Sequence, residues 1–198
     1  MLRYPGGTPL DAHTVGYTFD QNFLSDLGMT VAYDGRRNAL GSALFVLSMG
    51  AMVIGFGSGL WPVIRSYAAR AESRRAAQAA LVAAFVVCAA FAGVALTPED
   101  RVMGWHVRFT RLAFQVAPLV PLFMTVAAAR FDAAARRLVA AWILLALVMI
   151  AYALLITFGP ATGTPDGLRT MVLAQKAVTV VAGGLLLVVS VVPALRVR

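Results

Sequence analysis

The sequence predicts an all-α integral membrane protein, a five-helix transmembrane bundle preceded by an extramembrane N-terminal segment. Hydrophobic residues make up 60% of the 198 residues and charged residues 13%, and the mean hydropathy is +0.79. Soluble proteins carry about 25% charged residues. The apolar residues form long blocks separated by short polar joints. Since one crossing needs about 20 apolar residues, the chain has room for about five spans and one extramembrane segment.

The N-terminal segment, residues 1–38, is too polar to cross a bilayer and forms the first of two predicted parts of the chain. Its beginning is rich in Gly, Pro and Thr, which predicts irregular structure. The run YPGG at 4–7 predicts a turn, because Pro fixes φ and Gly allows positive φ. Residues 21–29 are expected to form a short helix along the membrane surface, with Asp20 as its N-cap.

The second part, residues 39–198, is the predicted bundle, and small residues in it predict close helix packing. Ala51, Gly55 and Gly59 recur every four residues in the first span, and Gly183 lies in the last. Such small residues let transmembrane helices approach each other closely. The expected spans are about 39–64, 76–96, 109–129, 138–158 and 170–195.

The third predicted span combines prolines with polar residues. Pro118 and Pro121 lie in its middle and predict a kink, since Pro lacks the N–H of a helical hydrogen bond. Arg111 and Gln115 lie four residues apart and therefore on one face of the helix. Their position near the outer end of the span makes them candidates for binding a lipid or another ligand.

The basic residues predict the orientation of the chain. The net charge is +8, from 17 basic residues. In the short loops and at the C-terminus, nine basic residues fall on one side of the predicted spans and three on the other. The positive-inside rule then predicts an N-terminus outside and a C-terminus in the cytoplasm, and we expect a bacterial cytoplasmic (inner) membrane as the location. Arginines at span ends contact lipid headgroups, so we expect no nucleic-acid binding.

Lys176 is the only lysine and lies in the last predicted span. At 1.5 Å per residue it is roughly 8 Å inside the outer end of that span. Ionisable groups inside membranes are functional candidates, so Lys176 and the adjacent Gln175 are candidates for ligand or lipid binding. The alternatives are a lysine that reaches outward to the headgroups, or one paired with an aspartate for structural reasons.

Catalytic residues are not predicted with any specificity. Ser25, Asp26 and His106 are weak candidates, because a carboxylate, an imidazole and a hydroxyl can form a hydrolytic triad. No nucleophile signature surrounds Ser25. Asp26 is better interpreted as a helix-capping or salt-bridging carboxylate. Its expected partners are Arg36, Arg37, Arg111 and Lys176.

Metal and cofactor sites are not expected. A zinc site needs three or four ligands, and His13 and His106 are the only histidines. The single cysteine, Cys88, cannot form an intrachain disulfide or a C-x-x-C motif.

Several short motifs carry a family resemblance: YPGGT at 4–8, Gly16-Tyr17, NFLSDLG at 22–28, then Asn38, Ser42, Phe45 and His106. Together they resemble the uncharacterised prokaryotic membrane family known as domain of unknown function 998. The resemblance implies about six spans, an outer segment between the first two, and distant eukaryotic relatives linked to lipid remodelling or autophagy. It implies no catalytic residues.

One departure from the family pattern lies at the start of the chain. Family members have an apolar span before YPGG, whereas only Met1, Leu2 and Arg3 precede it here. Either that span is lost or the chain begins downstream of the true start. A lost span would leave a gap that a helix of another protein can fill.

Two classes of function are compatible with these observations. The first is a non-catalytic accessory subunit of a larger respiratory or photosynthetic membrane complex, with the N-terminal segment as an outer docking surface. The second is a lipid-modifying enzyme or small-amphiphile transporter with an outward-facing site around Asp26, His106, Arg111 and Lys176. The expected partners are membrane lipids and other membrane subunits. A polar cavity joining Lys176 to Asp26 would favour the second class.

Overall fold

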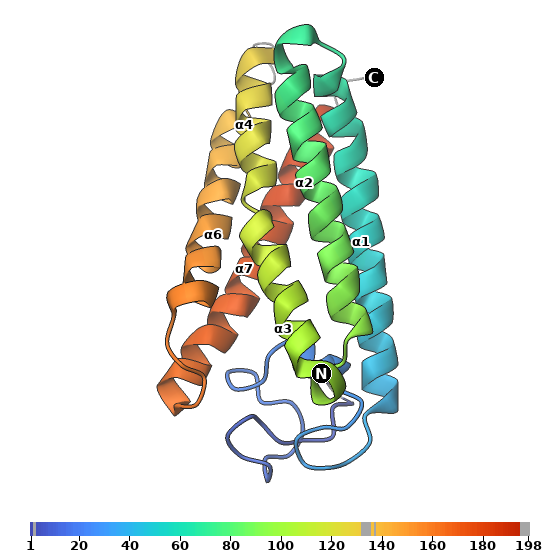
Figure 1. The fold of residues 1–198 in the computed structure, drawn as a ribbon, viewed down its shortest axis with the longest axis vertical. Helices are drawn as coiled ribbons and strands as arrows, with labels where there is room; N and C mark the ends of the chain where they lie inside the picture. The colour runs from blue at the N-terminus through green and yellow to red at the C-terminus, as the bar shows by residue number, and fades with distance from the viewer. Residues whose placement is uncertain (2, 132–135, 137, 195–198) are drawn as a thin grey trace.

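The chain folds into an all-α bundle with the N-terminal segment at one end (Figure 1). The computed structural model describes residues 1, 3–131, 136 and 138–194. Within these residues there is no β-strand, only two isolated bridges in the N-terminal segment. Five helical stretches are long and apolar enough to cross a membrane. The predicted fold class is therefore confirmed. We call residues 1–38 the cap, and the two ends of the bundle the cap end and the far end.

Seven helices make up the described chain, and two of them share one crossing. The crossing at Glu99–Phe131 consists of α3 and α4 in succession. The elements are η1 (Ser25–Gly28), α1 (Ala39–Ala68), α2 (Ala71–Leu96), α3 (Glu99–Val116), α4 (Leu119–Phe131), α6 (Val139–Phe158) and α7 (Pro165–Ala194).

The helices extend beyond the predicted spans into the polar joints. Helix α1 runs to Ala68 and α2 begins at Ala71, although 65–75 falls between two predicted spans and was expected to be a polar joint. Arginine and alanine are good helix formers, so the arginines that follow the apolar span end the span but do not end the helix. Helix α3 likewise begins at Glu99, directly after Pro98, because acidic residues in a first turn complement the helix dipole.

The predicted proline kink is confirmed. Helix α3 ends at Val116 and α4 begins at Leu119, so the break falls at Pro118. Pro121 lies inside the first turn of α4, where its missing N–H has no helical partner to lose.

The short helix expected over 21–29 is wrong. Only a single 3₁₀ turn forms, with Leu24 and not Asp20 at its N-terminal boundary. Asp20 instead pairs with Arg169 of α7, 3.2 Å away. The side chains of Asn22 and Asp26 bond to nearby backbone groups, and such bonds compete with helical ones.

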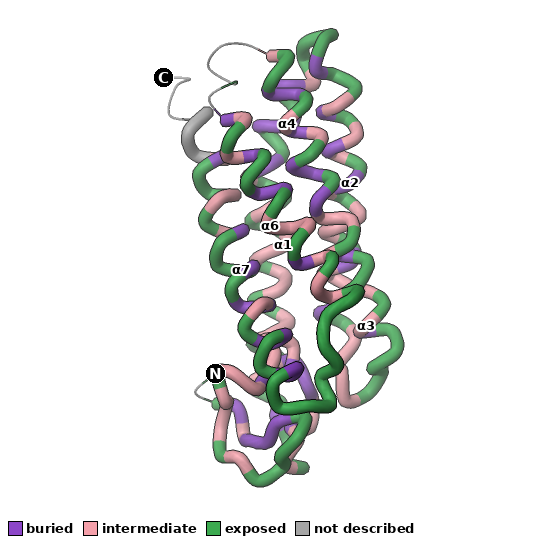
Figure 2. The backbone as a smooth tube through the Cα atoms, turned by 90° about the vertical axis from the view of Figure 1, so that its left-hand side faces the viewer, coloured by how far each residue is buried: buried purple, intermediate pink, exposed green. Residues whose placement is uncertain are grey.

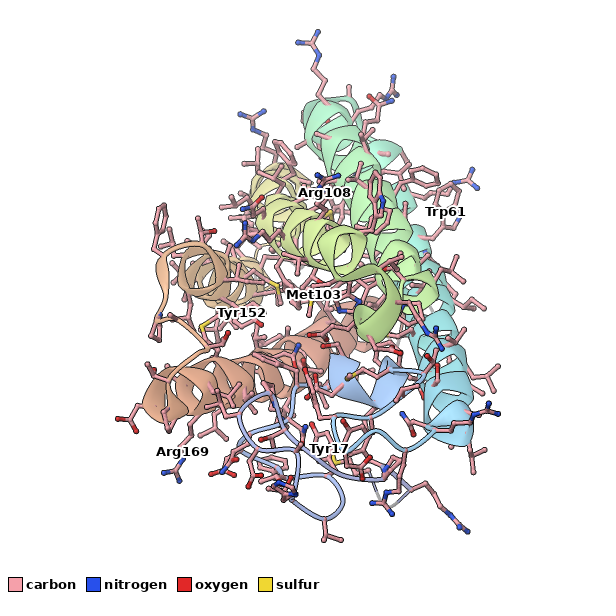
Figure 3. All side chains as sticks on the ribbon, turned by 60° about the horizontal axis from the view of Figure 1, so that its bottom comes forward. Tyr17, Trp61, Met103, Arg108, Tyr152 and Arg169 are labelled. Carbon is pink, nitrogen blue, oxygen red and sulfur yellow. The ribbon has the colours of Figure 1, made fainter. Side chains whose placement is uncertain are left out.

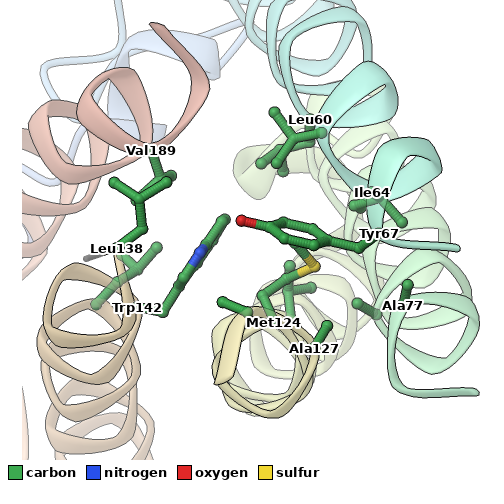
Figure 4. Packing of buried hydrophobic residues seen from close by; sticks show 14 of the residues in the cluster. Leu60, Ile64, Tyr67, Ala77, Met124, Ala127, Leu138, Trp142 and Val189 are labelled. Atoms are coloured by element: carbon green, nitrogen blue, oxygen red, sulfur yellow. The ribbon is translucent and has the colours of Figure 1, made fainter. Parts of the chain in front are cut away.

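The far half of the bundle is tightly packed. Ala77, Ala80 and Ala127 are fully buried where α2 and α4 meet the core. These small side chains let the helices approach closely. Trp142 of α6 and Tyr67 of α1 point toward each other and fill the space between (Figure 4).

Helix α1 joins this core only at its far end. From Leu60 onward it contributes buried residues, whereas no residue from Ala39 to Gly59 is buried. Among the predicted packing residues of α1, Ala51 and Gly55 are exposed. Only Gly59 lies near another helix, since a methyl group placed on it would sit 3.6 Å from Ser190 Oγ of α7.

Candidate functional site: a cavity beneath the cap

The cap is organised around Asn22, which is fully buried. Its Nδ2 donates to the Gly7 carbonyl at 3.0 Å and to Asp26 Oδ2 at 2.9 Å, and its Oδ1 accepts from Thr18 N at 2.9 Å. Gly7 has a φ of +82°, and a Cβ there would lie 2.5 Å from Tyr33 Cβ, so only glycine fits. One amide side chain thus joins three separate stretches of the cap.

Asp26 is buried in the cap beside Asn22. Its Oδ2 accepts hydrogen bonds from Asn22 Nδ2 and from Phe23 N at 3.0 Å, while Oδ1 has no hydrogen-bond partner in the described structure. Burial and the nearby charge of Glu99 raise the pKa of Asp26 to about 7. Asp26 lies inside the 3₁₀ turn η1, which has no side-chain cap, so the capping role expected for it is not met, and no ion pair joins it to a described basic residue.

Lys176 ties α7 to the cap. Its Nζ donates to the Asn22 carbonyl at 2.6 Å and lies 5.2 and 5.0 Å from the ring centres of Tyr17 and Phe19. Aromatic faces attract ammonium groups at such distances. Lys176 is only 7% exposed and its Nζ is bonded to the cap, so it does not reach the headgroups, and no ion pair joins it to an aspartate among the described residues. Figure 3 labels Tyr17 in the cap and Arg169, which lies nearer to the start of α7 than Lys176 does.

Further side chains attach the cap to α3 and α1. Asp100 at the start of α3 accepts from Thr30 N at 2.8 Å and from Thr30 Oγ1 at 2.6 Å. Asn38 Nδ2 donates to the Leu27 carbonyl at 3.0 Å, and Ser42 Oγ of α1 donates to the cap at 3.0 Å. Sequence reasoning did not single out Asp100, and it named Asn22 only as part of the motif at 22–28. The signal for Asp100 was its predicted position on the same side of the membrane as the cap.

Ser25 and His106 are brought together, with Glu99 between them. Ser25 Oγ donates to Glu99 Oε2 at 3.4 Å, and His106 Nε2 lies 3.9 Å from the same oxygen. His106 Nδ1 is 2.7 Å from the Thr97 carbonyl and therefore carries the hydrogen. A triad needs the imidazole between carboxylate and hydroxyl, and this cluster has the carboxylate in the middle.

The four residues of the predicted outward-facing site do not converge. Asp26 and Lys176 belong to the contact between cap and bundle, and His106 faces Glu99. Arg111 is exposed on α3. Gln115, also exposed, lies 3.4 Å from Thr157 Oγ1 of α6, outside the bundle interior.

A cavity of about 190 Å³ lies inside the cap-end half of the bundle. Leu24 and Ser25 of the cap line it, together with side chains from every crossing. Its wall is almost entirely apolar, and none of the described lining residues is charged. The lining residues with polar side chains are Ser25, Thr110, Gln175 and Thr179. The large apolar side chains of the lining include Phe45, Met49, Met52, Phe91, Phe114 and Met149.

A second hollow, the α1–α2 groove, lies next to this cavity. Its volume is about 250 Å³, and its lining includes Trp61 and Phe85, whose side chains are exposed. Both hollows share a set of wall residues. These are Val53, Phe56, Leu60, Ala84 and Cys88. The cavity and the groove therefore adjoin, and the exposed side chains of Trp61 and Phe85 place the groove at the outer surface of α1 and α2.

Comparison of the chain with protein-family models, with curated proteins and with solved structures finds no match. The resemblance to domain of unknown function 998 therefore stays a prediction. Among the described residues, no group of three or more His, Cys, Asp or Glu side chains is placed to hold a metal ion.

Proposed function

We propose that this membrane protein binds the hydrocarbon chain of a lipid or other amphiphile inside the cap-end half of its bundle. The observation that carries the proposal is the apolar cavity of about 190 Å³. Dry apolar cavities of about 150 Å³ bind molecules the size of benzene.

Helix α1 gives such a chain a route from the bilayer. No residue from Ala39 to Gly59 is fully buried, although α1 packs along α2, so the side chains of this wall stay partly exposed toward the bilayer. Phe45, Met49 and Phe56 line the cavity from this stretch. Methionine side chains are unbranched and polarizable, so they adapt to irregular apolar ligands.

The cap closes the cavity at the end where the ligand's polar group would lie. Leu24 and Ser25 form that end, held by Gln175 and Glu99. Binding or carriage of an amphiphile fits this arrangement better than hydrolysis, because Ser25, Glu99 and His106 stand in the wrong order for a triad.

Two glycines of α7 provide the test. Gly183 lines the cavity and Gly184 is exposed, and a Cβ at either position meets no atom within 4 Å. We expect Gly183→Leu to fill the cavity and to remove the lipids that copurify with the protein, measured by native mass spectrometry from nanodiscs. Gly184→Leu is the matched control and should retain them. Equal lipid content in both variants would refute the proposal.

A second candidate is an accessory subunit of a larger membrane complex. It is supported by the exposed face of α1 that carries Ala51 and Gly55, since small residues suit close contact with a helix of another protein. Purification in mild detergent tests it. A stoichiometric partner that is lost in Gly55→Leu supports this candidate, and a protein that purifies alone counts against it.

We propose further that the protein resides in a bacterial cytoplasmic membrane with the cap outside. The uneven arginine distribution supports this orientation. Val15 in the cap is 91% exposed, so Val15→Cys offers a labelling site. A membrane-impermeant thiol reagent added to intact cells should modify the introduced cysteine. If it is modified only after the cells are lysed, the cap lies inside and the proposed orientation is wrong.

A further inference from the structure

Two threonines at the cavity present acceptors and no donors. Thr179 Oγ1 donates its hydrogen to the Gln175 carbonyl at 2.7 Å, and Thr110 Oγ1 donates to the His106 carbonyl at 2.8 Å. The hydroxyl hydrogens are thus used within the helices. Each oxygen keeps a lone pair that a ligand can use.

Gln175 presents the complementary donor. Its Oε1 accepts from Leu24 N at 2.7 Å, which fixes the orientation of the amide. Its Nε2 has no hydrogen-bond partner among the described residues, although Gln175 lines the cavity and is only 9% exposed. Nε2 is not among the fully buried polar atoms that lack a partner, so it is still accessible, and a ligand oxygen here would accept a hydrogen bond that no described protein group accepts.

The cavity offers no counter-charge to a ligand. No charged residue is among the described residues that line it. The nearest cation on α7, Lys176, already donates to the Asn22 carbonyl, and Arg111 is exposed. Glu99 lies behind Ser25 and would repel an anion. A phosphate or carboxylate buried here would lose its water without an ionic partner.

Resting on the proposed function, we propose that the cavity takes a neutral single-chain amphiphile whose head is a hydroxyl or a carbonyl. The head oxygen accepts a hydrogen bond from Gln175 Nε2. A hydroxyl head also donates to Thr179 Oγ1, one helical turn away on the same face. The cavity of about 190 Å³ holds only the first part of a long chain, and the remainder extends toward the α1–α2 groove, which shares wall residues with the cavity.

Matched 16-carbon probes test the head group. Hexadecanol, methyl palmitate, palmitate, hexadecyl phosphate and hexadecane are added to the protein in nanodiscs at pH 8, and bound probe is measured by native mass spectrometry against Gly183→Leu as background. We expect hexadecanol and methyl palmitate to bind at least about tenfold more tightly than either anion, the difference expected of roughly one buried hydrogen bond or more.

Two variants locate the head. Gln175→Glu keeps an oxygen for Leu24 N and replaces the free amide donor, so it should lose about tenfold in hexadecanol affinity. Gln115→Glu, on the exposed face of α3, is the matched control and should lose nothing. Thr179→Val leaves the hydrogen bond between Leu24 N and Gln175 untouched. It should lower the affinity for hexadecanol severalfold and leave the affinity for hexadecane unchanged.

The outcomes separate the two proposals. Anionic probes that bind as tightly as hexadecanol, or a Thr179→Val variant with unchanged hexadecanol affinity, would overturn the neutral-head inference and leave chain binding intact. If no probe binds above the Gly183→Leu background, hexadecane included, both the inference and the proposed function fail.

Discussion

The two halves of the bundle are built from the same kinds of residue and packed differently. In the far half, Ala80 and Ala127 are fully buried, and Trp142 and Met124 fill the space that they leave. The cap-end half encloses a cavity lined by larger apolar side chains. Figure 2 shows buried residues concentrated around α2 and α4 and within the cap. Apolar composition alone therefore does not produce a packed interior.

The difference follows from what holds each half together. In a bilayer, apolar side chains gain little by leaving lipid, so helices associate through close packing and hydrogen bonds. The far half uses close packing between small residues. The cap-end half uses polar contacts from Lys176, Gln175 and Asp100 to the cap, and these fix its ends while leaving the space beneath them unfilled.

The largest effect should come from removing the centre of the cap. Asn22→Leu leaves the Gly7 carbonyl, Thr18 N and Asp26 without their buried partner, at about 1–3 kcal/mol for each group. We expect residues 1–38 to lose protection while the far half stays folded. Limited proteolysis with circular dichroism measures both, and a variant cap as resistant as the wild-type cap would contradict the expectation.

The pH should act on the cap next most strongly. The raised pKa of Asp26, about 7 against 3.8, means that the folded cap holds a proton that the unfolded segment releases. Cap stability is therefore fully present below pH about 4 and falls as the pH rises to about 7, by about 2–4 kcal/mol at 1.4 kcal/mol per pKa unit.

Hydrogen exchange at Phe23 N between pH 5 and pH 8, corrected for the intrinsic exchange rate, measures this loss. Asp26→Asn imitates the protonated carboxyl and should keep the cap protected at both values. The same pH dependence in the variant would assign the effect to another group.

Overpacking compares the two halves directly. Ala80→Leu adds volume where no space exists and should destabilise the bundle by about 1–3 kcal/mol. Gly183→Leu adds volume at the cavity and should cost less or stabilise, because it also removes a helical glycine. Unfolding in SDS or by heat measures both. Equal destabilisation by the two variants would show that the cap-end half is as tightly packed as the far half.

The smallest effect should follow from the surface ion pair between cap and α7. Arg169 lies 3.2 Å from Asp20, but the arginine side chain is 65% exposed. Exposed pairs contribute about 0–1 kcal/mol, so Arg169→Ala should barely change the protection of the cap. A loss as large as that of Asn22→Leu in the same proteolysis assay would mean that this pair anchors the cap.

Hydropathy was enough to predict the fold class, because the thickness of the bilayer sets the length of an apolar span. The prolines predicted the kink, because proline disrupts a helix at its own position. Helix ends were less predictable, since charges mark the membrane boundary while α1 continues to Ala68. Most of the structure of the cap could not be predicted from the sequence. The hydrogen bond from Asn22 to the Gly7 carbonyl joins residues 15 positions apart, and no local pattern encodes it.

The candidate site was predicted in its parts and not in its arrangement. Lys176 and Gln175 were singled out as polar groups within a span and candidates for ligand binding, and in the structure Lys176 binds the cap and Gln175 lines the cavity. The cavity itself has no sequence signal. Whether Met49 or Phe114 fills a space or borders one depends on how six helices converge, which periodicity does not determine.

The bare stretch of α1 has a mechanical consequence. The helix is anchored at one end by Ser42 and at the other by Ile64 and Tyr67 in the core, with nothing buried from Ala39 to Gly59. Between these anchors α1 packs mainly along α2 and its residues stay partly exposed, so this wall of the cavity is the one whose side chains can rearrange around a guest while both anchorages stay in place.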